Sequence, residues 1–320
     1  MCSFVVIYAF LKVYKASIAL VFYMDWNTII PIPSKKELMD RAVQKAKKIQ
    51  EPQPHQNIKR ISSMTNYIVD TLDKTMKSFP TFEELSPFYR ALVSVRLQET
   101  MRQQLARIGG MKKTLRSVAR QMSARKEPFS HFVARADSIL KEEALYELSK
   151  GRMVLRSFPI IKEHLFTVCI GGFPNVGKTT LLNRLAQSSA QVNSYAFTTK
   201  KLNVAYLTQD YSVQLIDTPG TLNRDKMNRV EHQAYLALEH VADLIVYVYD
   251  LSEPYPLAMQ EELDEQMKRF APVLYYCSKR DLLGDAPIGA YAKQSKKKIY
   301  TFEELRTELL VGAKRRRSIL

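Results

Sequence analysis

The chain has 320 residues, 46% of them hydrophobic, which is enough to bury one α/β domain and a smaller companion domain. Lysine and arginine outnumber aspartate and glutamate by 48 to 32, and the net charge of +16 predicts a polyanionic partner such as RNA, DNA or an acidic membrane; a generally basic proteome is the alternative. Three cysteines exclude a disulfide framework and favour a reducing compartment, and the five histidines lack the spacing of metal ligands.

The first 23 residues form an apolar extension. Its two apolar runs, Phe4–Leu11 and Ala16–Tyr23, are separated by lysines, and neither reaches the ~18–20 apolar residues of a membrane span. A small-residue cleavage site for a signal peptide is missing. Three interpretations stay open: a mis-called start with Met24 as the initiator, a membrane or interfacial anchor, or a packed N-terminal element.

The region that follows, up to about His164, is predicted to be helical. Ser34-Lys-Lys-Glu37 has the form of a capping box and opens a helix that runs toward Lys48. The further expected elements are a helix over about Ile58–Lys77, a proline-bounded turn and short helix at Phe79–Tyr89, a long helix that Gly109-Gly110 could interrupt, and a helix over about Phe129–Leu155.

The long helix carries an apolar face between Met111 and Met122 and a basic face beside it. The basic side chains line up at helical spacing, which makes this stripe the local candidate for contacts with RNA phosphates. An ordinary solvated helix face fits the pattern equally well. The residues concerned are Lys112, Lys113, Arg116 and Arg120.

The segment Gly172-Phe-Pro-Asn-Val-Gly-Lys-Thr179 satisfies the pattern of a phosphate-binding loop. The apolar run Leu165–Ile170 before it predicts a strand, and Thr180–Ala186 after it predicts a helix, which is the context that the pattern requires. Backbone N–H groups would face the phosphates, Lys178 would reach the β- and γ-phosphates, and Thr179 would hold Mg²⁺. The candidate nucleotide contacts are Gly172, Phe173, Pro174, Asn175, Val176, Gly177, Lys178, Thr179 and Thr180.

Two further segments would complete a site for Mg²⁺ and a triphosphate. Asp217-Thr-Pro-Gly220 closes the apolar strand Tyr211–Ile216, so that Asp217 can bind Mg²⁺ directly or through water and the Gly220 N–H can contact the γ-phosphate. A threonine in Tyr195–Lys200 could bind Mg²⁺ only when the triphosphate is present, which makes an order–disorder switch. A hydroxyl-rich turn before the strand Leu202–Leu207 is the alternative.

Guanine selection is assigned to Ser278-Lys-Arg-Asp281, which follows the apolar strand Pro272–Cys277. Asp281 can accept two hydrogen bonds from guanine N1 and N2, which adenine cannot supply, and the stem of Lys279 can lie over the base. Serine at position 278 replaces the usual asparagine and lacks its two-ended amide, so guanine specificity should survive with less support. A charged turn after a strand is the alternative.

The end of the chain contains one more candidate loop. Tyr291-Ala-Lys293 could support the base through its backbone, ahead of the amphipathic closing helix Phe302–Leu310. The alternation of strands and helices predicts an α/β P-loop domain with a mostly parallel sheet, preceded by an all-α helical bundle. The expected limits are 1–23 for the apolar extension, 24–164 for the helical domain, 165–312 for the P-loop domain and 313–320 for a basic tail.

The motifs from Gly172 to Asp281 resemble those of translation-factor-related GTPases of the Obg type, whose wording includes Gly-Phe-Pro-Asn-Val-Gly-Lys and Tyr-Ala-Phe-Thr-Thr-Lys. Within that group the helical element at Phe79–Tyr89, together with Gly151-Arg-Met153 and Asp250-Leu-Ser-Glu253, resembles the nucleolar GTP-binding protein 1 (Nog) family. The chain is similar to the short, archaeal-type form of that family over roughly residues 26–310.

The resemblance implies a slow GTPase that binds GTP or GDP with Mg²⁺ and assists assembly of the large ribosomal subunit, with the helical domain against ribosomal RNA. Such a protein would be ribosome-associated in the cytoplasm, or nucleolar in a eukaryote. By the same resemblance Thr199, rather than Thr198, is the Mg²⁺-binding threonine. The residues expected to take part in hydrolysis are Lys178, Thr199, Gly220 and Asn175.

The catalytic group is left open. Thr221 stands where many GTPases place a glutamine, so hydrolysis would use another group, an activating partner, or K⁺ held by Asn175. Asn175 could instead only shape the loop. Two other hypotheses stay open: a membrane-associated Obg-like GTPase anchored by Met1–Tyr23, and a GTP-binding scaffold with negligible turnover.

Overall fold

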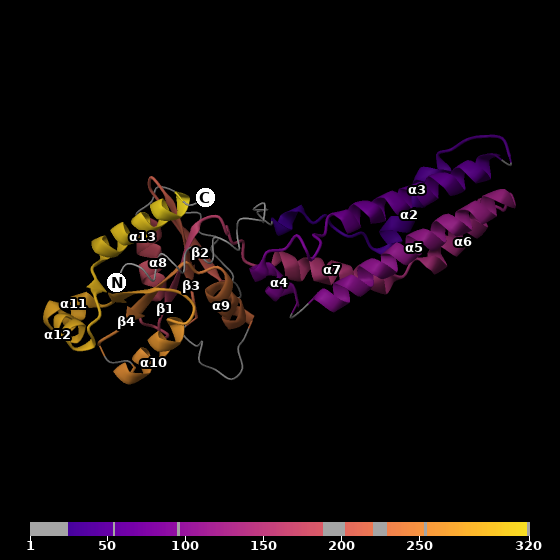
Figure 1. Cartoon of the computed structure of the whole chain (residues 1–320). Coiled ribbons are helices and arrows are strands. Elements are labelled where there is room, and N and C mark those ends of the chain that lie inside the picture. The colour runs from indigo at the N-terminus through magenta and orange to yellow at the C-terminus, as the bar shows by residue number, and fades with distance from the viewer. Residues whose placement is uncertain are drawn as a thin grey trace. The chain divides into compact units, whose positions relative to one another are not determined.

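A computed structural model describes residues 25–53, 55–94, 97–187, 202–219, 229–252 and 255–318. The predictions made for the extension 1–23, for Thr199 and for Gly220 lie outside these residues. The chain divides into two compact units, which Figure 1 shows: a helical unit of Asp25–Leu85 and Tyr89–Phe158, and an α/β unit that contains Ser86–Phe88 and the chain from Pro159 on.

The helical unit is a bundle of antiparallel helices (Figure 1), in which α2 packs on α3, α3 on α5, and α5 on α7. A short 3-10 helix, η1, precedes them, and its Trp26 packs edge-on against the rings of Tyr89 and Phe158 at 5.3 and 5.7 Å between centroids. The elements are η1 (Trp26–Thr28), α2 (Lys35–Lys47), α3 (His55–Lys77), α4 (Pro87–Ser94, which belongs to this unit from Tyr89 on), α5 (Gln98–Ala124), α6 (Phe129–Ile139) and α7 (Glu142–Arg156).

The capping box predicted at the start of α2 is confirmed. The Ser34 hydroxyl accepts a hydrogen bond from the Glu37 N–H at 3.2 Å, and the Glu37 carboxylate accepts one from the Ser34 N–H at 3.1 Å. Leu38, Ala42 and Ala46 follow at spacings of four and are buried, so one face of α2 enters the bundle core.

The interruption that Gly109-Gly110 could cause is not found, and one prediction about the helices was wrong. α5 passes through Gly109-Gly110 without interruption, because the packing of neighbouring turns outweighs the low helix propensity of two glycines. The single helix expected over Phe129–Leu155 is two helices, α6 and α7. They are separated by Leu140 and Lys141, both in extended conformations, because Leu140 turns inward and is only 1% exposed, and the acidic first turn of α7 starts a new helix.

The α/β unit contains, among the described residues, a six-stranded sheet of order β2-β3-β1-β4-β5-β6. Only the β2–β3 pair is antiparallel, which confirms the predicted mostly parallel sheet. The strands are β1 (Phe166–Gly171), β2 (Asn203–Thr208), β3 (Ser212–Asp217), β4 (Leu244–Tyr249), β5 (Val273–Cys277) and β6 (Ile299–Tyr300).

Helices cover both faces of this sheet (Figure 1). Apolar residues of α8 and α13 share one buried cluster with Val168 and Ile170 of β1, whereas Tyr247 of β4 hydrogen-bonds to the carbonyl of Gln260 in α10 at 2.6 Å on the opposite face. The helices are α8 (Lys178–Gln187), α9 (Arg229–His240), α10 (Leu257–Met267), α11 (Arg280–Leu283), α12 (Asp285–Ser295) and α13 (Phe302–Arg317). Among the described residues, no helix has the length and the apolar character that crossing a membrane requires.

Because β1, β3, β4 and β5 are parallel, their carboxyl ends meet at one edge of the sheet. In the register, Ile170 lies opposite Asp217 and Tyr249 lies opposite Cys277. The chain segments that leave this edge are therefore neighbours in space, although up to about a hundred residues separate them in sequence. Ligands of open parallel sheets bind at such an edge.

Candidate functional site

The predicted phosphate loop lies between β1 and α8, in the strand–loop–helix order expected of it. Gly172 has φ +138°, and a Cβ there would lie 2.6 Å from the Val248 carbonyl oxygen, so only glycine fits. Gly177 has φ +91° and also requires glycine. Asn175 lies at the outer turn of the loop, where it is exposed and has φ +60°. This left-handed backbone conformation usually costs a non-glycine residue about 1–2 kcal/mol of free energy. The backbone thus wraps around a point in front of the α8 N-terminus.

Lys178, the first residue of α8, is held inside this loop. Its side chain is 7% exposed, and its Nζ donates a hydrogen bond to the Phe173 carbonyl at 2.6 Å. Burial lowers the pKa of Lys178 to about 8, and the nearby Asp217 carboxylate offsets only part of this effect. An ammonium group beside loop N–H groups is suited to bind an anion with several oxygen atoms.

Thr179 and Asp217 come together across the loop. The Thr179 hydroxyl donates to Asp217 Oδ2 at 2.6 Å, and Asn203 Nδ2 lies 3.4 Å from the same oxygen. Asp217 Oδ1 is buried and has no hydrogen-bond partner within the part of the chain that the structure describes. A hydroxyl and a carboxylate with an unused oxygen fit the requirements of Mg²⁺, which takes hard oxygen ligands and completes its shell with water and phosphate.

Thr218 fixes the position of that carboxylate. Its N–H and its hydroxyl both donate to the Ile170 carbonyl, at 3.1 and 2.8 Å, and the side chain is buried. The segment after β3 is therefore bound to the end of β1 at Ile170, two residues before the phosphate loop begins. Sequence reasoning did not assign this role to Thr218, because its partner is a backbone atom of a distant strand.

The predicted base loop leaves the same edge of the sheet at the end of β5. Ser278 is 7% exposed and donates to the Tyr249 carbonyl through both its N–H, at 2.9 Å, and its hydroxyl, at 3.2 Å. Its Cβ also lies 3.4 Å from where a Cβ on Gly177 would be, so the phosphate and base loops are in contact. Asp281 lies in α11 and is exposed, which leaves its carboxylate accessible to a ligand.

Lys279 makes a contact that the sequence did not predict. The residue is left-handed, with φ +51°, and its Nζ lies 2.5 Å from Oδ2 of Asp250, at the end of β4. Asp250 is fully buried. Asp250 belongs to the Asp-Leu-Ser-Glu segment that carries the family resemblance. The sequence alone could not identify Lys279 as its partner, because the two residues lie at the ends of different strands.

The prediction that Tyr291-Ala-Lys293 forms a base-supporting loop was wrong. These residues lie within α12, Tyr291 is 6% exposed, and its hydroxyl donates to Glu261 at 3.1 Å. The turn that follows the last strand is instead at Thr301, which caps α13 through a second capping box. Tyr291 and Ala292 pack α12 against its neighbours. A three-residue motif could not show whether these residues lie in a helix or in a loop.

The four candidate RNA-binding residues divide into two pairs. On α5, Lys112 and Arg116 both face Asp73 of α3: Lys112 hydrogen-bonds to it, and Arg116 lies 3.7 Å away. Lys113 and Arg120 are exposed, and no ion pair involves either of them among the described residues. The charge of this second pair is therefore not offset by a nearby carboxylate within the part of the chain that the structure describes.

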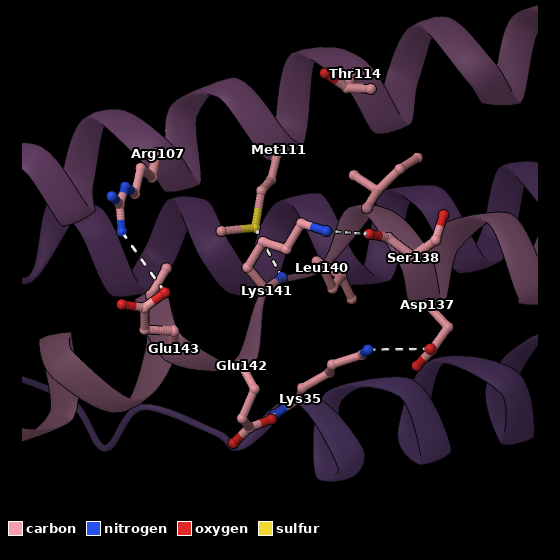
Figure 2. Close-up of a pocket in the computed structure, with 12 residues that line it drawn as sticks. Lys35, Arg107, Met111, Thr114, Asp137, Ser138, Leu140, Lys141, Glu142 and Glu143 are labelled. Carbon is pink, nitrogen blue, oxygen red and sulfur yellow. Dashed lines mark hydrogen bonds and ion pairs between the residues drawn. The ribbon is translucent and has the colours of Figure 1, made fainter.

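A hollow of about 860 Å³ lies in the helical unit, between α5 and the α6–α7 junction. Figure 2 draws the residues that line it. Four of its charged side chains pair with one another: Lys35 with Asp137 at 3.0 Å, and Arg107 with Glu143 at 4.0 Å. Glu142 accepts the Lys35 N–H at 3.0 Å, so it caps α2 from another helix. None of the residues predicted for nucleotide or RNA binding lines this hollow.

Comparison with known proteins identifies both units. Residues 27–161 match the family model of the NOG1 N-terminal helical domain, and residues 167–279 match that of the 50S ribosome-binding GTPase. The uncharacterized protein MJ1408 of Methanocaldococcus jannaschii is 31% identical over 245 residues, which cover 71% of this chain and 69% of that protein. The chain belongs to the nucleolar GTP-binding protein 1 family. It therefore carries a guanine-nucleotide-binding domain of the GTP-hydrolase class.

Relatives in the Nog family are longer than this chain. Nucleolar GTP-binding protein 1 of Encephalitozoon cuniculi is 26% identical, over 75% of this chain and 50% of that protein, and the Kluyveromyces lactis protein is 32% identical, over 58% and 31%. The chain thus spans about half, or less, of the length of these relatives. Among solved structures, the G domain of the T. maritima FeoB iron transporter is similar at 24% identity, over 46% of this chain and 98% of that one, with a TM-score of 0.38.

Proposed function

We propose that this Nog-family chain is a GTP-hydrolysing switch protein that acts in assembly of the large ribosomal subunit by binding RNA through its helical unit. The observation that carries the proposal is the charge of that unit. Between residues 25 and 158 there are 25 lysines and arginines against 14 aspartates and glutamates, a net +11 of the chain's +16. A charge excess outside the nucleotide-binding unit indicates a second, polyanionic ligand.

Each part of the nucleotide site has an assigned role. Lys178 contacts the β- and γ-phosphates from inside the loop formed by residues 172–177. Thr179 and Asp217 would hold Mg²⁺, with Thr199 as a third ligand when GTP is bound, and the bound ion would supply positive charge beside the phosphates. Gly220 senses the γ-phosphate. Support comes from the 2.6 Å contact between Thr179 and Asp217, and from the unpartnered oxygen of Asp217.

Base recognition is assigned to the loop after β5. Asp281 accepts hydrogen bonds from guanine N1 and N2, the stem of Lys279 covers the base, and Ser278 holds the loop to β4. The exposed carboxylate of Asp281 and the double contact of Ser278 with the Tyr249 carbonyl support this arrangement.

Hydrolysis is expected to be slow in the isolated chain. Thr221 cannot orient the attacking water as a glutamine would, so the rate depends on K⁺ held near Asn175 or on an activating partner. The left-handed, exposed position of Asn175 supports a cation site at the outer turn of the loop. Equal turnover in potassium and sodium salts would remove the K⁺ proposal.

On the helical unit, Lys113 and Arg120 are the proposed phosphate contacts, because Lys112 and Arg116 face Asp73. The match to the 50S ribosome-binding GTPase family and the similarity to nucleolar GTP-binding proteins support a ribosome-associated location, nucleolar in a eukaryote. Hydrolysis of GTP would then change how this unit, or an activating protein, docks on the particle.

Co-sedimentation with large-subunit particles tests the switch. The protein is mixed with particles in GTP, GDP or a non-hydrolysable GTP analogue over a series of salt concentrations. We expect binding that weakens steeply with salt and differs between GTP and GDP. Lys178→Ala should make the three nucleotides equivalent. If sedimentation of the unmodified protein never distinguishes GTP from GDP, the switch is contradicted, and only the RNA-binding part of the proposal remains.

A further inference from the structure

The end of β4 organises the base loop. The Tyr249 carbonyl accepts both hydrogen bonds that Ser278 donates, and the next residue, Asp250, pairs with Lys279. The Ser278 hydroxyl therefore donates its proton to strand β4 and not to a neighbouring loop. An asparagine side chain would have both a donor and an acceptor to offer to neighbouring loops, so part of the support for the base loop has to come from elsewhere.

Asp250 is built to hold Lys279. Its side chain is fully buried; Oδ1 accepts hydrogen bonds from the N–H and the hydroxyl of Ser252, at 2.9 and 2.6 Å, which turns Oδ2 toward the lysine. Burial would raise the pKa of Asp250, but the hydrogen bonds from Lys279 and Ser252 outweigh it and hold the pKa below its usual value. The carboxylate is therefore charged, and the Lys279 ammonium is its counter-ion.

A buried glutamine fixes Asp250 in turn. Gln260 is 1% exposed, and its amide bonds both backbone groups of Asp250: Oε1 accepts from the N–H at 3.0 Å, and Nε2 donates to the carbonyl at 2.8 Å. This pairing resembles one step of a sheet ladder, and it extends the order of β4 by one residue. The same Nε2 lies 3.2 Å from the Tyr255 carbonyl.

Tyr255 connects the Gln260–Asp250 pair to the phosphate loop. Its ring packs on that of Phe173, in the phosphate loop, with 4.8 Å between centroids. Phe173 in turn accepts the hydrogen bond of Lys178 through its carbonyl oxygen. One buried amide thus links the loop that would hold the base to the loop that would hold the phosphates.

We propose that Asp250, fixed by Gln260, is a positioning residue for guanine recognition: it holds the Lys279 stem over the base and compensates for Ser278. The inference rests on the proposed assignment of Ser278–Asp281 as the base loop. Asp250 does not touch the nucleotide; it acts through Lys279, which distinguishes its role from that of Asp281.

Nucleotide binding by Asp250→Asn tests this, because the substitution keeps the size of the side chain and removes its charge. With a fluorescent GDP probe, competed by GDP, IDP, ADP and inorganic pyrophosphate, we expect GDP to bind about 10- to 100-fold more weakly. Pyrophosphate affinity should stay within about twofold, so the preference for GDP over ADP should fall. Asp285→Asn is the matched control, since Asp285 pairs with Arg280 of the same loop at 3.6 Å but is 94% exposed.

A double-mutant cycle separates positioning from general support of the fold. Lys279→Met keeps an apolar stem and removes the ammonium. If Asp250 acts through Lys279, then Asp250→Asn has almost no further effect on the GDP-to-ADP ratio in the Lys279→Met background. The same loss in both backgrounds, or an equal loss of GDP and pyrophosphate binding, overturns the inference. Absence of any guanine preference in the unmodified protein would instead contradict the proposed base loop.

Discussion

The Thr179 hydroxyl and the Asp217 carboxylate are 2.6 Å apart, although 38 residues separate them in the chain. Parallel pairing of β1 with β3 brings them together, since Ile170 lies opposite Asp217 and the phosphate loop begins two residues later. The two oxygen atoms are joined by a hydrogen bond, and at this distance both could bind the same divalent cation. The other oxygen of Asp217 is left for a water bound to that cation.

Removing that carboxylate charge should weaken the Mg²⁺-dependent part of GTP binding. For Asp217→Asn we expect GTP affinity in millimolar Mg²⁺ to fall about 10- to 100-fold, because a charged ligand is replaced by a neutral amide. Affinity in excess chelator should change much less. Titration of GTP binding against Mg²⁺ measures both. Thr307→Ala, an exposed threonine on α13, is the control that should leave the Mg²⁺ dependence intact; equal losses with and without Mg²⁺ would argue against a metal role.

GTP binding should weaken above pH 8. The pKa of Lys178 is lowered to about 8 by burial, so the free protein loses this charge above that pH. Phosphates favour the charged lysine, so binding takes up a proton there, and the dissociation constant should rise by about tenfold per pH unit. Below about pH 7 this group should contribute no pH dependence. Calorimetry in buffers of different ionisation enthalpy counts the protons, and Lys178→Arg should abolish the uptake because arginine stays charged.

The same buried charge should cost stability when no nucleotide is bound. A lysine whose folded pKa lies below its unfolded value favours unfolding increasingly as pH falls from about 10.5 to 8, and the full cost is present below pH 8. Lys178→Met should therefore raise the free energy of unfolding of the nucleotide-free protein, by up to about 3 kcal/mol at pH 7. Urea unfolding with and without GTP gives the comparison; nucleotide should stabilise only the unmodified chain.

Two glycines should respond oppositely to alanine. At Gly172 the added Cβ would lie 2.6 Å from the Val248 carbonyl, at φ +138°, so Gly172→Ala should destabilise the α/β unit by about 2 kcal/mol or more and abolish nucleotide binding. At Gly109, within α5, a Cβ meets nothing within 4 Å, and Gly109→Ala should stabilise the helical unit by about 0.5–1 kcal/mol. Thermal unfolding of the two variants checks both signs.

The two basic pairs on α5, Lys113 with Arg120 and Lys112 with Arg116, should differ in their contribution to RNA binding. Neutralising Lys113 and Arg120 to glutamine should weaken RNA binding and reduce the salt slope by about two, with unfolding unchanged. Lys112→Gln should instead lower stability modestly, because Asp73 loses a partner, and it should alter the salt slope less. Filter binding with large-subunit RNA at several salt concentrations gives the slopes. Equal slopes for all variants would mean that the RNA binds elsewhere.

Sequence determined the features that depend on neighbouring residues. The phosphate loop is contiguous, with its glycines required by backbone angles at 172 and 177, and the α2 capping box spans four residues. Apolar runs predicted the strands, and the alternation of strands and helices predicted the mostly parallel sheet. The loop, the capping box and the individual strands are predictable because the interactions responsible act within one turn or one strand.

Tertiary structure alone decided which distant residues meet. The pairing of Lys279 with Asp250, the use of Ser278 on Tyr249 and the neutralisation of Lys112 by Asp73 each depend on strand or helix neighbours that no local pattern specifies. Tertiary packing also decided the points that the sequence left open or predicted wrongly. It kept α5 continuous through two glycines, turned Leu140 inward and placed Tyr291 in a helix. Burial free energy is a property of the assembled fold, so it overrides local propensity wherever the two disagree.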